Sequence, residues 1–176
     1  MGLEMNGSTT GKWLTGRRAR IVGHAPDIAQ ALAAHDALLF ADRPCDILVH
    51  VAASPVPKPV HELSHAEWRH TLDRGLDQRF FEAKAFPEAL RGTGHGGSIL
   101  FVGAPEQSLG SDHAAAGALG NLVKSLSVEW ARDGVRVNAI LSGNEGKTHG
   151  NLAAYLVSEY AAYVTGAVMG IDCDDG

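Results

Sequence analysis

The longest regular pattern in the chain is a helical repeat of apolar residues between positions 113 and 132. The repeat predicts one amphipathic helix with a buried stripe. Asp133 and Gly134 end this helix, because glycine accepts the left-handed backbone conformation at a helix terminus. Residues 135–141 are mostly apolar and rich in β-branched side chains, and they predict a buried strand directly after the helix.

Shorter apolar runs predict further strands at 20–23, 37–40, 46–53 and 98–102, with a last strand within 158–172. Between them lie predicted helices at 28–34 and 151–157 and two helical segments within 67–90. Gly75 falls inside one of these segments, which predicts a kink or a close contact with another helix. Strands that alternate with helices predict an α/β fold with a doubly wound parallel sheet. We expect a single domain over residues 1–176, in which residues 1–15 form a loose N-terminus.

Charge and composition narrow the classes of function. The formal net charge is −5 and the basic residues are scattered, which argues against nucleic acid as a partner. No apolar run approaches the roughly 18 residues of a membrane span, and no secretory leader pattern opens the chain. We therefore expect a cytoplasmic protein that does not bind membranes. Cys45 and Cys173 are too few for a disulfide framework or a metal cage, and we expect reduced thiols.

One motif resembles a zinc site. Residues 61–65 read His-Glu-Leu-Ser-His, which matches the H-E-x-x-H pattern of zinc proteases. That chemistry needs both histidines on one face of a continuous helix. Here Ser64 and Glu67 predict a capping box, so the helix begins after Ser64 and separates the two histidines. We expect no metal site.

Three segments carry a family resemblance. Residues 125–140 read SLSVEWARDGVRVNAI, residues 46–53 read DILVHVAA, and residues 158–172 read SEYAAYVTGAVMGID. These segments resemble short-chain dehydrogenases/reductases over roughly residues 46–176. The resemblance implies a Rossmann-like fold in which the nucleotide-binding part near the N-terminus is shortened and the substrate lid is missing.

The resemblance also implies that the catalytic residues of the family are missing. The family uses Tyr, Lys, Ser and Asn, and the matching positions here are His113, Gly117, Ala104 and Gly75. The family's glycine-rich fingerprint, T-G-x-x-x-G-x-G, would begin at Thr15 and Gly16, but no further glycine follows in register. We therefore expect no catalytic residue of the family type and no bound dinucleotide cofactor.

In family tetramers two long helices and the last strand form the subunit contacts. The resemblance therefore implies a non-catalytic subunit that assembles with an active homologous subunit, most simply as a heterotetramer. The expected interface residues are Leu76, Phe80, Phe81, Lys84, Leu119, Leu122, Val123, Leu126, Trp130, Val168 and Ile171. Two alternatives stay open. One is a stand-alone module that binds a small ligand, and the other is an enzyme of altered chemistry that uses His113 with Ser108 or Ser111.

Overall fold

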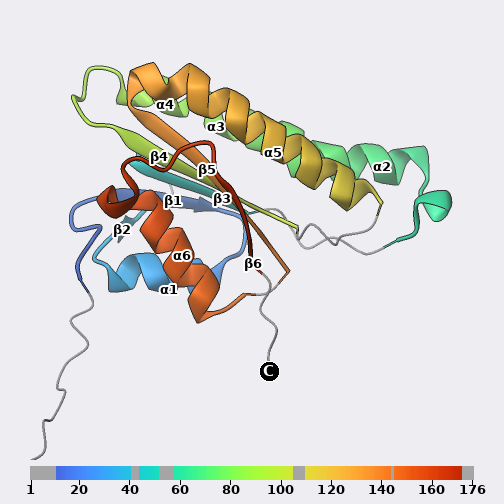
Figure 1. Ribbon diagram of the computed structural model, residues 1–176, viewed down its shortest axis with the longest axis horizontal. Helices are drawn as coiled ribbons and strands as arrows, with labels where there is room; N and C mark the ends of the chain where they lie inside the picture. Colours follow the sequence, from blue (N-terminus) through green and yellow to red (C-terminus); the bar gives the residue numbers. More distant parts are fainter. Residues whose placement is uncertain (1–10, 41–43, 52–57, 105–109, 144, 172–176) are drawn as a thin grey trace, which may run out of the picture.

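A single parallel sheet forms the centre of the molecule (Figure 1). The computed structural model describes residues 11–40, 44–51, 58–104, 110–143 and 145–171. Within them, six strands lie in the order β2-β1-β3-β4-β5-β6, and every neighbouring pair is parallel. The strands are β1 (Arg18–Val22), β2 (Leu38–Leu39), β3 (Ile47–Val51), β4 (Gly97–Gly103), β5 (Val135–Ser142) and β6 (Val168–Ile171). The predicted doubly wound parallel sheet is confirmed.

Helices cover both faces of the sheet (Figure 1). On one face, α1 (Pro26–Ala34) packs against α6 (Lys147–Val157). The other face carries α2 (His65–Leu72), a π-helical segment η2 (Asp73–Asp77), α3 (Gln78–Ala83), α4 (Phe86–Leu90) and α5 (Ser111–Glu129). Short 3₁₀ turns η1 (Val60–Glu62), η3 (Trp130–Asp133) and η4 (Glu159–Ala161) complete the described helices.

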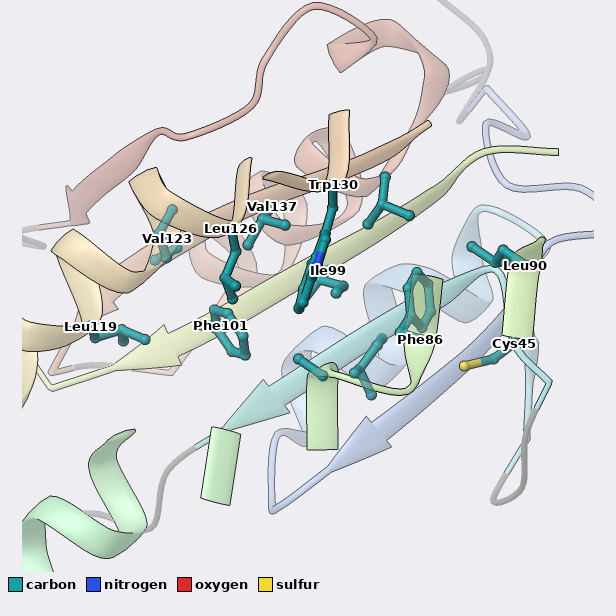
Figure 2. Close-up of a cluster of buried hydrophobic side chains, with 14 of the residues drawn as sticks. Cys45, Phe86, Leu90, Ile99, Phe101, Leu119, Val123, Leu126, Trp130 and Val137 are labelled. Atoms are coloured by element: carbon teal, nitrogen blue, oxygen red, sulfur yellow. The ribbon is translucent and has the colours of Figure 1, made fainter. Parts of the chain in front are cut away.

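Strand β4 separates the two hydrophobic cores. All of its residues are buried, as expected for a central strand with helices on both faces. Successive side chains point to opposite faces, so Ile99 and Phe101 join the core under α5, whereas Leu100 and Val102 join the core under α1 and α6. Figure 2 shows the first core, where Trp130 lies beside Ile99. The sheet is therefore fixed from both sides at β4.

The helix boundaries follow the predicted signals. Ser64 accepts a hydrogen bond from the Glu67 N–H at 3.2 Å, while Glu67 accepts one from the Ser64 N–H at 2.8 Å, which confirms the capping box. His61 lies in η1 and His65 begins α2, so the two histidines do not share a helix face. The described residues contain no cluster of His, Cys, Asp and Glu that could hold a metal ion. None of their helices combines the length and apolar character that a membrane span requires.

The predicted interface on α5 needs a correction. Leu119, Val123, Leu126 and Trp130 are at most 7% exposed, because they form the stripe of α5 that packs on the sheet. These four side chains have no surface to offer a partner. The other expected residues keep some exposed surface. Phe80, Phe81 and Lys84 are exposed on α3 and at its C-terminal end, and the half-buried ones are Leu76, Leu122, Val168 and Ile171.

Gly75 lies in η2, where the helical chain widens into a π turn and meets α5. A Cβ atom added to Gly75 would lie 2.8 Å from the Cβ of Ala115, closer than real Cβ atoms approach. The close helix contact that was one of the two predictions for this glycine is present. By contrast, a Cβ added to Gly117 on α5 would meet nothing within 4 Å.

These two glycines give a matched test of packing. Gly117→Ala should stabilise the chain by up to about 1 kcal/mol, because alanine is the better helix former and the site is open. Gly75→Ala should destabilise it by about 1–3 kcal/mol, because the added methyl group overpacks the contact with Ala115. Urea unfolding of both variants measures the difference, and equal stabilisation by the two substitutions would contradict the close contact.

Candidate functional site

The carboxyl ends of β1 and β3 mark the place where a parallel sheet of this order binds ligands. The chain runs from β1 outward to β2 and then returns to β3 on the other side of β1. Such a reversal leaves a crevice at the carboxyl ends of the two central strands, beside the first residues of the following helix. Here that position is the turn between β1 and α1, which comprises residues 23–25.

This turn holds a single glycine in the place of a glycine-rich phosphate turn. Gly23 has a φ of +99° and lies so close to the Val51 carbonyl that no side chain fits. In the pattern T-G-x-x-x-G-x-G, Gly23 takes the first glycine position, and the later two positions read Asp27 and Ala29. The prediction that placed this pattern at Thr15–Gly16 is wrong, because those residues lie in a turn before β1.

Asp27 places a carboxylate in the first turn of α1. Its Oδ2 lies 2.7 Å from the Nδ1 of His149 and accepts the Gly146 N–H at 2.9 Å. The His149 and Asp27 side chains are only 4% and 12% exposed. A helix N-terminus favours negative charge. In this chain its own carboxylate supplies that charge, where a bound phosphate would otherwise do so.

The surroundings of Asp27 favour its charged form. Burial alone would raise the pKa of the Asp27 carboxyl, but hydrogen bonds from Gly146, His149 and Ile28 hold that pKa below its ordinary value of 3.8. Helix α6 approaches closely at this point, since a Cβ on Gly150 would lie 2.6 Å from the Asp27 carbonyl oxygen. The pair therefore also fixes α1 against α6.

A groove of about 550 Å³ runs along the exposed side of α5 towards β5 and β6. His113, Gly117 and Lys124 line it, so two of the four catalytic positions of the resemblance face this groove. Lys124 lies two helical turns beyond Gly117 and was not singled out from the sequence, although a spacing of seven residues on a helix places both on one face.

The other two catalytic positions face a different space. Gly75 and Ala104 line a small cavity between η2, α5 and the end of β4, together with Arg74, Arg79 and Asp112. Positions 113 and 117 of α5 therefore face the groove, whereas positions 112 and 115 face the cavity. The four positions are divided between this groove and the adjacent cavity, and Ala116 lines both.

The serines considered as substitutes do not complete a site with His113. Ser111 is 4% exposed and lies two residues before His113 on α5, and side chains at this spacing do not face each other. Ser108 lies outside the described residues, as does Cys173. Cys45 is a buried thiol.

His50 occupies a position where the resemblance has asparagine. It lies on β3 and is 5% exposed. Burial, with a smaller effect of the nearby Arg79 charge, lowers the pKa of His50 to about 4. The imidazole is therefore neutral at neutral pH.

A six-stranded parallel sheet with helices on both faces and a crevice at its carboxyl ends defines a Rossmann-like α/β protein. A family model described as enoyl-(acyl carrier protein) reductase matches residues 22–146. With this match over most of its length, the chain belongs to the short-chain dehydrogenase/reductase family.

Individual relatives agree with this assignment. Galactitol 2-dehydrogenase (L-tagatose-forming) from Cereibacter sphaeroides is 30% identical over 190 residues, which span 88% of this chain and 74% of that protein. A tropinone reductase homolog from Arabidopsis thaliana is 31% identical over 99 residues, which span 54% of this chain and 37% of the homolog.

Solved structures support the same fold. A hydroxysteroid dehydrogenase from Escherichia coli superposes with a TM-score of 0.82 at 20% identity, covering 93% of this chain and 98% of that one. The enoyl-[acyl-carrier-protein] reductase (NADH) from Aquifex aeolicus gives a TM-score of 0.80 at 19% identity, covering 93% of this chain and 97% of that one.

The Asp27–His149 pair predicts a specific pH dependence of stability. Asp27→Asn should cost about 1–3 kcal/mol at pH 7, because it weakens a buried charge-assisted contact to His149. Because the pKa of Asp27 is lower in the folded state than in the unfolded state, the charged carboxylate stabilises the fold above about pH 4. This stabilisation disappears as the pH falls through the pKa of Asp27 in the folded state. Wild-type stability should therefore fall more steeply than that of the variant between about pH 5 and pH 2, measured by urea unfolding.

Asp36→Asn is the matched control. Asp36 forms a surface ion pair with Lys12 at 2.9 Å, and both side chains are exposed. This substitution should cost less than about 1 kcal/mol. If the free energy of unfolding fell equally with pH for the wild type and Asp27→Asn, the ionised carboxylate of Asp27 would not stabilise the fold.

Proposed function

We propose that the chain is a catalytically inactive member of the family that assembles with an active homologous NAD(P)-dependent dehydrogenase and supports its structure. The observation that carries this proposal is the Asp27–His149 pair at the start of α1. A dinucleotide pyrophosphate placed there would meet a buried carboxylate of like charge.

The division of the four catalytic positions supports the same conclusion. Hydride transfer in the family requires an acid/base hydroxyl, a cation beside it, a second hydroxyl and an asparagine around one reacting carbonyl. Here the four places are His113, Gly117, Ala104 and Gly75, none of which supplies such a hydroxyl, cation or amide, and they are divided between the groove and the adjacent cavity. Restoring asparagine at position 75 would also meet the close contact with Ala115.

The exposed face of α3 supports assembly with a partner. Phe80 and Phe81 are 37% and 59% exposed and stack edge to face, with ring centroids 5.5 Å apart. The Lys84 ammonium lies 4.9 Å from the centre of the Phe81 ring. Exposed aromatic side chains are enriched at protein interfaces and often carry much of the binding energy there. A two-fold interface of this kind can accept a related chain in place of an identical one.

One candidate for the assembly is 2-[hydroxy(phenyl)methyl]succinyl-CoA dehydrogenase, an enzyme of anaerobic toluene degradation, and the family resemblance of the sequence does not single out this pathway. In that enzyme an inactive chain is paired with an active homologue. We propose this dehydrogenase as the first assembly to test.

Co-expression with the nearest intact homologue, followed by native mass spectrometry, tests the proposal. The expected product is a mixed tetramer that binds nicotinamide cofactor only at the stoichiometry of the active chains. Phe81→Ser should weaken the mixed assembly at least tenfold, because it removes a central aromatic anchor without disturbing the core.

Leu39→Ser is the matched control for the assembly experiment. Leu39 is 45% exposed on β2, at the edge of the sheet farthest from β6. This variant should assemble like the wild type. A homo-oligomer that ignores the homologue would overturn the subunit proposal, and the 550 Å³ groove would then favour the stand-alone ligand-binding module.

His113→Ala separates the subunit from an enzyme of altered chemistry. His113 is exposed in the groove and would have to act without a facing hydroxyl from Ser111. We expect kcat/KM of the mixed complex to change less than about twofold. A loss of about 100-fold or more in an intact complex is typical of a missing general acid or base, and would identify His113 as catalytic.

A further inference from the structure

Arg79 is a buried cation with unused hydrogen-bond donors. It is 1% exposed and is among the largest fully buried side chains. Its Nη2 donates to the Val102 carbonyl at 2.6 Å, and its guanidinium lies 6.0 Å from the centre of the Phe101 ring. Its Nε and Nη1 are buried and find no hydrogen-bond partner in the described part of the chain.

Arg79 lines the small cavity that also contains the places of the missing catalytic serine and asparagine. Arg74 from η2 and Asp112 from α5 face the same cavity, and the Arg74 Nε is likewise buried without a partner among the residues described. Two guanidinium groups therefore face one carboxylate. Among the described residues that line the cavity, one positive charge is in excess.

The other charged groups near Arg79 do not remove this excess. His50 is close enough for the Arg79 charge to influence it, and it is neutral at neutral pH. Glu82 forms an ion pair with Arg20 at 2.7 Å. Burial lowers the pKa of Arg79 to about 10, which leaves the guanidinium charged in the physiological range. An unpaired charge in such a place is costly, so an anion that enters the cavity gains a strong interaction.

The size of the cavity selects the kind of anion. Its volume is about 30 Å³. Each water-sized atom needs about 10–15 Å³, so two such atoms fit, which corresponds to the two oxygens of a carboxylate. Guanidinium N–H groups match planar carboxylates well. Sulfate has four oxygens and two negative charges, and exceeds both the space and the charge available.

We propose that the cavity between η2, α5 and the end of β4 is a binding site for the carboxylate group of a small monoanion, held by Arg79 and Arg74. The site lies where the family's catalytic hydroxyl and amide would be, and here it binds rather than reacts. This inference does not depend on the partner assembly proposed above.

Thermal unfolding and calorimetric titration of the full chain test the site with sodium formate as the probe. Formate should raise the unfolding temperature in a saturable manner, compared with sodium chloride at the same ionic strength, and sulfate should add nothing beyond its general salt effect. The heat of formate binding should saturate at one equivalent per chain. An equal response to chloride, or no saturable response to formate, would overturn the assignment.

Arg79→Met tests the residue itself. Replacing a buried unpaired cation with an apolar side chain of similar length is often neutral or stabilising, so this variant should fold and should lose formate binding at least tenfold. Arg132→Met, at an exposed arginine on η3, should bind formate like the wild type. Retained formate binding by Arg79→Met would overturn the proposal.

Arg74→Met provides a second variant in case the first unfolds, and it should also weaken formate binding. Native mass spectrometry of Arg79→Met with the homologue separates the two proposals. The mixed tetramer should form as with the wild type, because Arg79 is buried within its own chain.

Discussion

The close approach of η2 to α5 at Gly75 and Ala115 limits which side chains fit at the carboxyl end of β4. Because a Cβ atom at position 75 would lie 2.8 Å from the Cβ of Ala115, an asparagine there would clash with α5. The contact falls within the π turn Asp73–Asp77. Arg74 and Arg79 line one cavity beside Ala104, and His113 lines the adjacent groove.

Two buried polar sites occupy the carboxyl ends of the strands, and they differ in how their charge is balanced. At the start of α1, the Asp27 Oδ2 meets His149 and a backbone N–H of the same chain, so the carboxylate has partners inside the chain, although Asp27 Oδ1 and His149 Nε2 are buried without a hydrogen-bond partner among the described residues. Beneath α3, the Arg79 guanidinium keeps two nitrogens without a partner among the described residues. The first site holds helices together, whereas the second is open to an external anion.

Much of the fold was predictable because its signals are local. The apolar stripe of α5, the capping box at Ser64 and the buried run of β4 each follow from neighbouring residues. The Asp27–His149 pair was not predictable, since its partners are 122 positions apart and no periodicity joins them. Arg79 did leave a sequence signal that could have been used. It lies three residues after Leu76 and four before Ala83, where a helical repeat expects an apolar side chain.

Periodicity shows that a helix buries one face but does not show what that face packs against. The apolar stripe on α5 therefore fits an interface with a partner as well as it fits a contact with the sheet. Leu119 and Trp130 pack on the sheet of their own chain (Figure 2), so a partner would meet the opposite side of α5. The fingerprint was sought at Thr15–Gly16 because that dipeptide matches two letters of the pattern. Only the position of β1 shows that Gly23 is the glycine that follows the strand.

A helix whose N-terminus is neutralised by its own carboxylate does not need a nucleotide to become ordered. In the proposed assembly, the inactive chain would reach its folded form at any ratio of oxidised to reduced nicotinamide in the cell. Only the active chains would respond to that ratio. Only the active subunits would then change their cofactor load with that ratio, while the inactive subunits kept a constant shape.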